Sequence, residues 1–176
     1  MAVLGVCTVV LASSIWINPV AKGVPEITKS ETMQQIRDLV KEDPKAIWLV
    51  ADMAYPATNI PAMAGADCLN TTQTYPQKTR WEMLDQEGEC EDIYNRYCHI
   101  RASLGSKTML ELVSTDYVEV TLSPEDLKKL NIRYIVSTND FDEKIAAGTT
   151  NIFTDSGIEF QKYYEGTQLS IYGCVY

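Results

Sequence analysis

The sequence lacks the residues and patterns that most enzymes use. It contains one histidine, and no G-x-S-x-G, H-E-x-x-H, phosphate-loop or G-x-G-x-x-G pattern occurs. Lysine and arginine are scattered along a chain whose net charge is −9. Because nucleic acids and anionic membrane surfaces attract basic patches, this distribution argues against both as partners. We therefore predict no catalytic residue, no metal site, no cofactor and no nucleic-acid partner.

The five cysteines include no C-x-x-C pair, so a structural zinc site lacks its usual ligand spacing. Two interpretations remain. The thiols are buried or free, as cysteine often is in protein cores. Alternatively, two of them form a disulfide in an extracytoplasmic domain, and Cys90 and Cys98 are then the first candidates because they are close in the sequence.

The first 21 residues carry no charge. The run from Ala2 to Ile17, AVLGVCTVVLASSIWI, is slightly shorter than the about 20 residues of a full membrane span. It fits the end of a transmembrane helix, a buried strand rich in β-branched residues, or an atypical signal peptide. We expect residues 1–20 to be a membrane-proximal apolar segment or first strand, ordered against the domain from Ile15 to Val20.

Residues 21–176 are expected to form a single soluble domain. Thr28 and Glu31 fit a capping box that starts a helix ending at Asp43-Pro44, and residues 46–50, AIWLV, read as a strand buried on both faces. Further segments are predicted as helices near residues 61–64, 76–84, 91–97, 124–131 and 143–147, and as strands near 68–69, 110–112, 118–122, 132–136, 158–164 and 169–176. The fold class is α/β or α+β, with a mixed sheet covered by helices and a closing β-hairpin.

The order of these segments resembles the C-terminal extracytoplasmic region of large bacterial polytopic membrane proteins related to the YfhO-like and C-type glycosyltransferase families. The matching stretches are Asn18-Pro19 to Gly23, Tyr75-Pro76, residues 91–97 (EDIYNRY), residues 127–136 (LKKLNIRYIV), and residues 163–166 (YYEG) followed by Ile171-Tyr172. In such proteins the catalytic acid is expected in loops near the first membrane spans. The resemblance therefore implies an accessory domain and carries over no catalytic residue.

The segment from Tyr75 to His99 is the densest group of side chains suited to a sugar. Aromatic rings pack on the C–H faces of sugars, and amide or guanidinium groups bind hydroxyls. The binding candidates are Trp81, Tyr94, Asn95, Arg96 and Tyr97. The alternative interpretation is that the aromatic residues pack in the core and that Arg96 pairs locally with Glu91 or Asp92.

Asp52 is a further candidate because it follows the strand at residues 46–50, and α/β folds place functional groups at the carboxyl ends of such strands. The alternative is a solvated loop acid or a helix cap. A Cys98–His99 catalytic pair is not expected, since adjacent residues on a strand point to opposite faces.

Two functions are compatible with these observations. The first is an accessory domain on the extracytoplasmic face of the cell membrane, which handles cell-envelope glycans or lipid-linked sugars by binding or positioning. Its expected partners are the transmembrane part of the same polypeptide and a saccharide ligand. The second is a free-standing carbohydrate-active enzyme that uses Asp52 with Glu91 or Asp92, since carboxylate pairs at a defined separation cleave glycosides.

Overall fold

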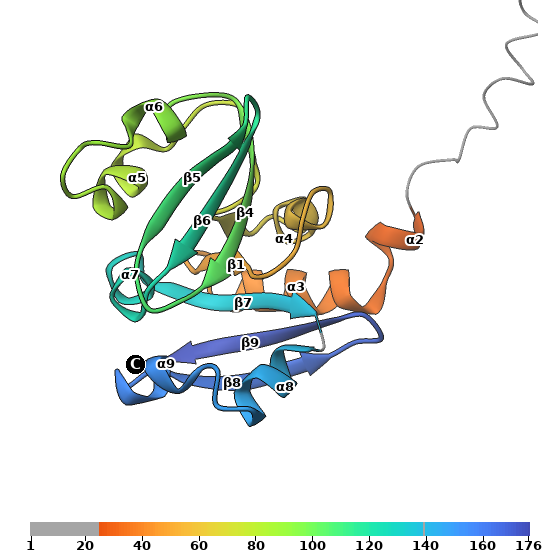
Figure 1. The fold of residues 1–176 in the computed structure, drawn as a ribbon. Helices are drawn as coiled ribbons and strands as arrows, with labels where there is room; N and C mark the ends of the chain where they lie inside the picture. The colour runs from red at the N-terminus through yellow and green to blue at the C-terminus, as the bar shows by residue number, and fades with distance from the viewer. Residues whose placement is uncertain (1–24, 139) are drawn as a thin grey trace, which may run out of the picture.

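The computed structural model describes residues 25–138 and 140–176 (Figure 1). The expectations for residues 1–20 lie outside the described residues. The described chain contains two mixed sheets and several helices, and it ends in a β-hairpin, which confirms the α+β class. The single mixed sheet expected from the sequence is thus two sheets, here called sheet A and sheet B.

Sheet A has five strands, in the order β2 (Asp67–Cys68), β1 (Ile47–Val50), β7 (Ile132–Thr138), β9 (Leu169–Val175) and β8 (Glu159–Glu165). β1 runs parallel to β2 and β7, whereas β9 runs antiparallel to β7 and β8. Trp48, Leu49 and Val50 are fully buried, which confirms that β1 is covered on both faces.

Sheet B has four strands, in the order β3 (Thr72–Gln73), β4 (Cys98–Leu104), β6 (Tyr117–Leu122) and β5 (Met109–Ser114). β4 and β6 run parallel, and β3 and β5 are antiparallel to their neighbours. The strands expected near residues 110–112 and 118–122 are confirmed as β5 and β6, which pair as an antiparallel hairpin. Burial alternates along β6, whereas the side chains of β5 are mostly exposed because β5 is the outer strand.

The two sheets are joined where β1 ends. Ala51 forms a parallel bridge with Ala102 of β4, and the backbone N–H of Asp52 donates to the Ala102 carbonyl at 2.8 Å. The loop that follows β1 therefore begins beside β4 of sheet B. One hydrophobic cluster includes Leu49 and Ile135 from sheet A together with Ile100 and Val120 from sheet B.

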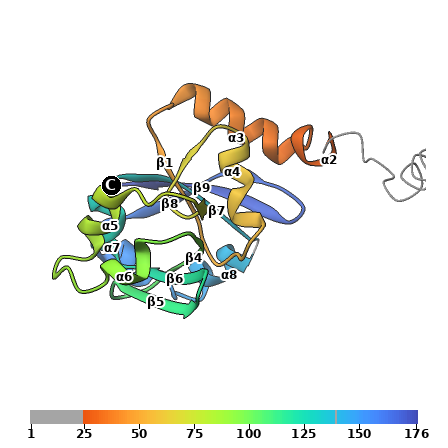
Figure 2. The same cartoon turned by 90° about the horizontal axis from the view of Figure 1, so that it is seen from above.

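The helices are α2 (Pro25–Thr28), α3 (Glu31–Glu42), the 3-10 helix η1 (Ala57–Asn59), α4 (Ile60–Met63), α5 (Lys78–Leu84), α6 (Glu91–Tyr94), α7 (Pro124–Lys129), α8 (Asp140–Ala146) and α9 (Asn151–Asp155). Figure 2 shows α3 on one side of sheet A and sheet B on the other. Ile36 and Leu39 of α3 pack with Trp48, Val50 and other residues of sheet A in a second cluster. Helical spacing of these apolar residues therefore gives α3 its buried face.

The predicted cap of α3 is wrong by two residues. Ser30 caps the helix, because its Oγ accepts a hydrogen bond from the backbone N–H of Met33 at 3.2 Å. Thr28 instead ends the short helix α2. The predicted start of α7 is confirmed, with Ser123 and Asp126 forming a reciprocal capping box.

Candidate functional site

Among the described residues, one face of sheet B carries side chains that are only partly buried. Burial alternates along β4 and β6, so that every second side chain enters the core. The side chains that point the other way are His99, Arg101 and Ser103 of β4 and Tyr117, Glu119 and Thr121 of β6. We call this surface the open face.

The open face consists of three cross-strand pairs. His99 lies opposite Tyr117, Arg101 opposite Glu119, and Ser103 opposite Thr121. Arg101 Nη1 and Glu119 Oε1 are 3.1 Å apart, and the two hydroxyl oxygens of the last pair are 3.2 Å apart. The surface therefore changes along the strands from aromatic to charged to hydroxyl-bearing.

Two further tyrosines enlarge the aromatic end. The ring centroid of Tyr55 lies 4.3 Å from that of His99, and the ring of Tyr97 meets His99 edge-on at 5.6 Å. Tyr55 and Tyr97 are 53% and 51% exposed. Both therefore keep about half of their surface available to a ligand. We call Tyr55, Tyr97 and His99 the aromatic cluster.

Hydrogen bonds hold the histidine in place. His99 Nδ1 lies 3.1 Å from the hydroxyl of Thr72 in β3. Asn59 supports this threonine twice, because its Nδ2 donates to Thr72 Oγ1 at 3.1 Å and its Oδ1 accepts from the Thr72 N–H at 2.9 Å. The Asn59 amide thus holds Thr72, and the hydroxyl of Thr72 in turn holds the ring of His99.

Asp52 lies at the edge of the same sheet. Its backbone has a φ of 61°, a left-handed conformation that is uncommon for residues other than glycine. Its carboxylate pairs with Nζ of Lys144 in α8 at 2.5 Å, and both side chains are partly exposed. The expected position after β1 is confirmed, and the lysine neutralises the acid there.

The buried candidates Trp81 and Tyr94 belong to the core. They are only 1% and 3% exposed, and their rings stack with centroids 6.0 Å apart. Gln73 Oε1 accepts from Trp81 Nε1 at 2.7 Å, and Gln73 Nε2 donates to the Tyr94 carbonyl at 2.7 Å. Burial raises the pKa of the Tyr94 phenol. Neither ring presents a face to solvent.

Asn95 and Arg96 make local contacts around α6. Asn95 Nδ2 donates to Glu91 at 3.1 Å, and the Arg96 guanidinium donates to the carbonyls of Asp92 and Thr115. Glu91 also pairs with Lys78, and the hydrogen bond between them lowers the pKa of the carboxyl and raises that of the lysine. Of the predicted set, the structure brings only Tyr97 into the aromatic cluster.

A cleft of about 290 Å³ lies on the other side of β3. Thr72, Thr74, Gln77 and Trp81 contribute to its lining, and so does Tyr75, which has 86% of its surface exposed. Thr72 borders both this cleft and His99. The polar lining of the cleft is therefore connected to the aromatic cluster through Thr72.

The sequence analysis missed Tyr55, Arg101, Tyr117 and Glu119. The alternation of Val118, Val120 and Leu122 already indicates that the residues between them point away from the core. That signal was sufficient to find Tyr117 and Glu119. For Tyr55 no local signal exists, since its contact with His99 depends on the joint between the sheets.

The described cysteines Cys68, Cys90, Cys98 and Cys174 are all free thiols, so the suggested pair Cys90–Cys98 is not linked in the structure. Within residues 25–138 and 140–176, histidine, cysteine, aspartate and glutamate form no group of three suited to a metal ion. None of the helices in these same ranges has the length and apolarity needed to cross a membrane.

The chain was compared with known families, curated proteins and solved structures. No curated protein and no solved structure matches the chain. A family model described as "Domain of unknown function (DUF7654)" matches residues 26–176. The match covers the whole described fold except its first residue, and the chain therefore belongs to the DUF7654 family.

Proposed function

We propose that this domain binds a saccharide on the open face of sheet B and does not transform it. We further propose that it does so as an extracytoplasmic accessory domain of a polytopic membrane protein that handles cell-envelope glycans or lipid-linked sugars. The observation that carries the proposal is the aromatic cluster, where two half-exposed tyrosines flank a hydrogen-bonded histidine.

The chemistry of the open face suits a sugar. Aromatic rings offer flat apolar surfaces to the C–H faces of a pyranose, and the neighbouring Arg101, Glu119, Ser103 and Thr121 offer donors and acceptors for hydroxyl groups. The three pairs span five residues of strand, which is four residue steps or about 13 Å at the usual rise per residue. A surface of that length favours an extended oligosaccharide over a single enclosed sugar.

The carboxylates support binding over catalysis. A glycosidase needs two acids at a defined separation. Asp52 is paired with Lys144 of α8, whereas Glu91 of α6 is paired with Lys78 of α5. Glu119 on the open face is likewise paired, with Arg101. These three acids thus each have a cationic partner, whereas Asp92 forms no ion pair among the described residues, and we assign no general acid or base.

The membrane attachment rests on the sequence. The uncharged run before residue 22 and the resemblance to C-terminal regions of polytopic proteins favour a transmembrane partner in the same polypeptide. The net charge of −9 favours an aqueous position away from anionic headgroups.

The test is an array of bacterial envelope glycans, followed by calorimetric titration of the best ligand. Tyr97→Ala and His99→Ala should each weaken binding of that ligand about two- to tenfold, because each removes an aromatic contact in the cluster that is worth about 0.5–1.5 kcal/mol. Tyr163→Ala is the matched control, since Tyr163 is 49% exposed on β8 of the other sheet. Binding that both cluster variants retain at full strength would contradict the proposal, as would the absence of any bound glycan.

A further inference from the structure

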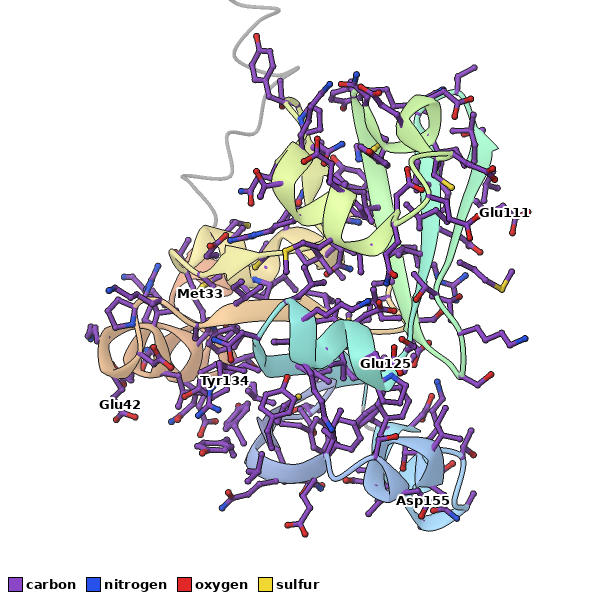
Figure 3. All side chains as sticks on the ribbon, turned by 90° about the vertical axis from the view of Figure 1, so that its left-hand side faces the viewer. Met33, Glu42, Glu111, Glu125, Tyr134 and Asp155 are labelled. Atoms are coloured by element: carbon purple, nitrogen blue, oxygen red, sulfur yellow. The ribbon has the colours of Figure 1, made fainter. Side chains whose placement is uncertain are left out.

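The outer strand of sheet B has a free edge. β5 pairs only with β6, and among the described residues no strand lies on its other side. Figure 3 shows Glu111 of β5 at the outer margin of the molecule. Met109 and Val113 are 58% and 53% exposed. An edge of this kind offers unpaired backbone N–H and C=O groups to another extended chain.

A groove follows this edge on the side opposite the open face. It has a volume of about 320 Å³ and lies between β5 and the loop that joins α5 to α6. Thr108 and Leu110 form the strand side, Leu84 adds an apolar contact, and Asp85, Glu87 and Glu89 form the loop side. A strand added to β5 would point alternate side chains into this groove.

The loop side of the groove is acidic. The carboxylate of Asp85 already accepts hydrogen bonds within its own loop, from the backbone N–H groups of Glu89 and Cys90 at 3.0 and 2.9 Å. Glu87 and Glu89 are exposed, and in the part of the chain that the structure describes they form no ion pair. Cys90 also lines the groove, and its pKa is raised by burial and then by the negative charges of Asp85, Asp92 and Glu89.

We infer that the edge of β5 accepts an extended basic segment of a partner protein by strand addition. Main-chain hydrogen bonds to β5 would supply the ladder, and lysine or arginine side chains at alternate positions would reach Glu87 and Glu89. A bulge between Leu112 and Ser114 interrupts the regular edge, so the ladder would run along Met109–Leu112.

The negative charge of the chain favours a basic partner segment at this edge over a second copy of the chain. Two copies paired through β5 would bring their acidic loops towards each other, and each chain carries a net charge of −9. Like charges of that size repel at an interface. A basic segment has the complementary charge. This inference is independent of the saccharide proposal, since it uses the outer edge and the opposite side of sheet B.

The probe is a fluorescent octapeptide of alternating lysine and valine, titrated against the full chain at low salt and followed by anisotropy. We expect saturable binding that weakens as salt is added. The same peptide with N-methyl groups on alternate residues keeps its charges but loses donors to β5, and it should not bind. An alternating glutamate–valine peptide should not bind either.

Charge-reversal variants locate the site. The double variant Glu87→Lys and Glu89→Lys should weaken the lysine peptide about tenfold or more. The control double variant Glu42→Lys and Glu159→Lys changes the net charge equally at exposed sites on α3 and β8, and should change binding less than about twofold. Bound peptide should also slow alkylation of Cys90, measured by peptide mass spectrometry.

Three results would overturn the inference. The first is no binding of the lysine peptide. The second is equal binding of the N-methylated peptide, which would mean charge attraction without strand addition. The third is sedimentation of the chain as a dimer that Met109→Lys dissociates, which would assign the edge to a second copy.

Discussion

The rings of Tyr55 and His99 lie 4.3 Å apart, although Tyr55 follows β1 of sheet A and His99 belongs to β4 of sheet B. The parallel bridge between Ala51 and Ala102 makes this contact possible, because it carries the chain from one sheet to the edge of the other. The contact between Tyr55 and His99 at the aromatic end of the open face therefore depends on the bridge that joins the two sheets.

Tyr55→Ala is expected to weaken saccharide binding without unfolding the domain. Tyr55 is 53% exposed, so its loss leaves no large cavity, whereas an aromatic contact is worth about 0.5–1.5 kcal/mol. Calorimetry should therefore show about a two- to tenfold higher Kd. Urea unfolding of the same variant serves as the control, and a large loss of stability would mean that Tyr55 acts through folding.

Gln73→Leu should destabilise the fold by about 2–4 kcal/mol, because two buried partners lose their hydrogen bonds. Trp81 Nε1 and the Tyr94 carbonyl each bond to Gln73 at 2.7 Å. The free energy of unfolding in urea is the measurement. Thr74→Ala, at an exposed neighbour, should change it by less than about 0.5 kcal/mol.

Asp126→Ala should destabilise the domain by about 2–3 kcal/mol, since a buried carboxylate oxygen accepts three hydrogen bonds. These come from the backbone N–H and the hydroxyl of Ser123, both at 2.8 Å, and from the hydroxyl of Thr108 at 2.5 Å. Ser123→Ala removes two bonds of the hydroxyl, which donates to Asp126 Oδ2 at 2.8 Å and accepts from the Asp126 N–H at 3.3 Å, and it should cost about 1–2 kcal/mol. Equal stability of Asp126→Ala and the parent chain would contradict this role.

The stability of the domain should fall at high pH. Burial raises the pKa of Cys68 and of Cys174 from 9.0 to about 12. Both thiols therefore stay protonated in the folded state while they ionise in the unfolded chain. Their contribution is complete below pH 9 and is lost between pH 9 and about 12. Chemical denaturation across this range should show a smaller decline for Cys174→Ala, and an unchanged decline would contradict the assignment.

The membrane proposal predicts the side of the membrane on which this domain lies. An alkaline phosphatase fused after Tyr176 in the protein as it is expressed in its host should be active in bacterial cells, because this enzyme matures only outside the cytoplasm. A green fluorescent protein at the same position should remain dark when exported by the general secretory route. The reverse pattern would place the domain in the cytoplasm.

Local patterns were sufficient for much of the fold. The apolar run at residues 46–50 predicts the doubly covered strand β1, and Ser123-Pro124 predicts the start of α7. The prediction of Thr28 as the cap of α3 was wrong, because Ser30 is a second hydroxyl residue within the same turn and is the one that caps the helix. The split into two sheets depends on the Ala51–Ala102 bridge, a long-range contact that no local pattern encodes.

The candidate site was less predictable than the fold. Composition alone does not separate a buried aromatic ring from an exposed one, so Trp81 and Tyr94 were grouped with Tyr97. The structure separates them because Gln73 holds the first two in the core, while Tyr97 lies at the surface just before β4. His99 was judged only as a partner of Cys98, and its role became visible when Tyr55 and Thr72 were placed beside it.

The most direct test of saccharide binding is nuclear magnetic resonance of the 15N-labelled chain during titration with the best glycan from the array. The account predicts that amide signals of Tyr97, His99, Arg101, Tyr117 and Glu119 shift together, while those of Trp48, Ile36 and Tyr163 stay in place. Shifts confined to sheet A, or to the groove beside β5, would contradict the assignment of the open face as the binding surface.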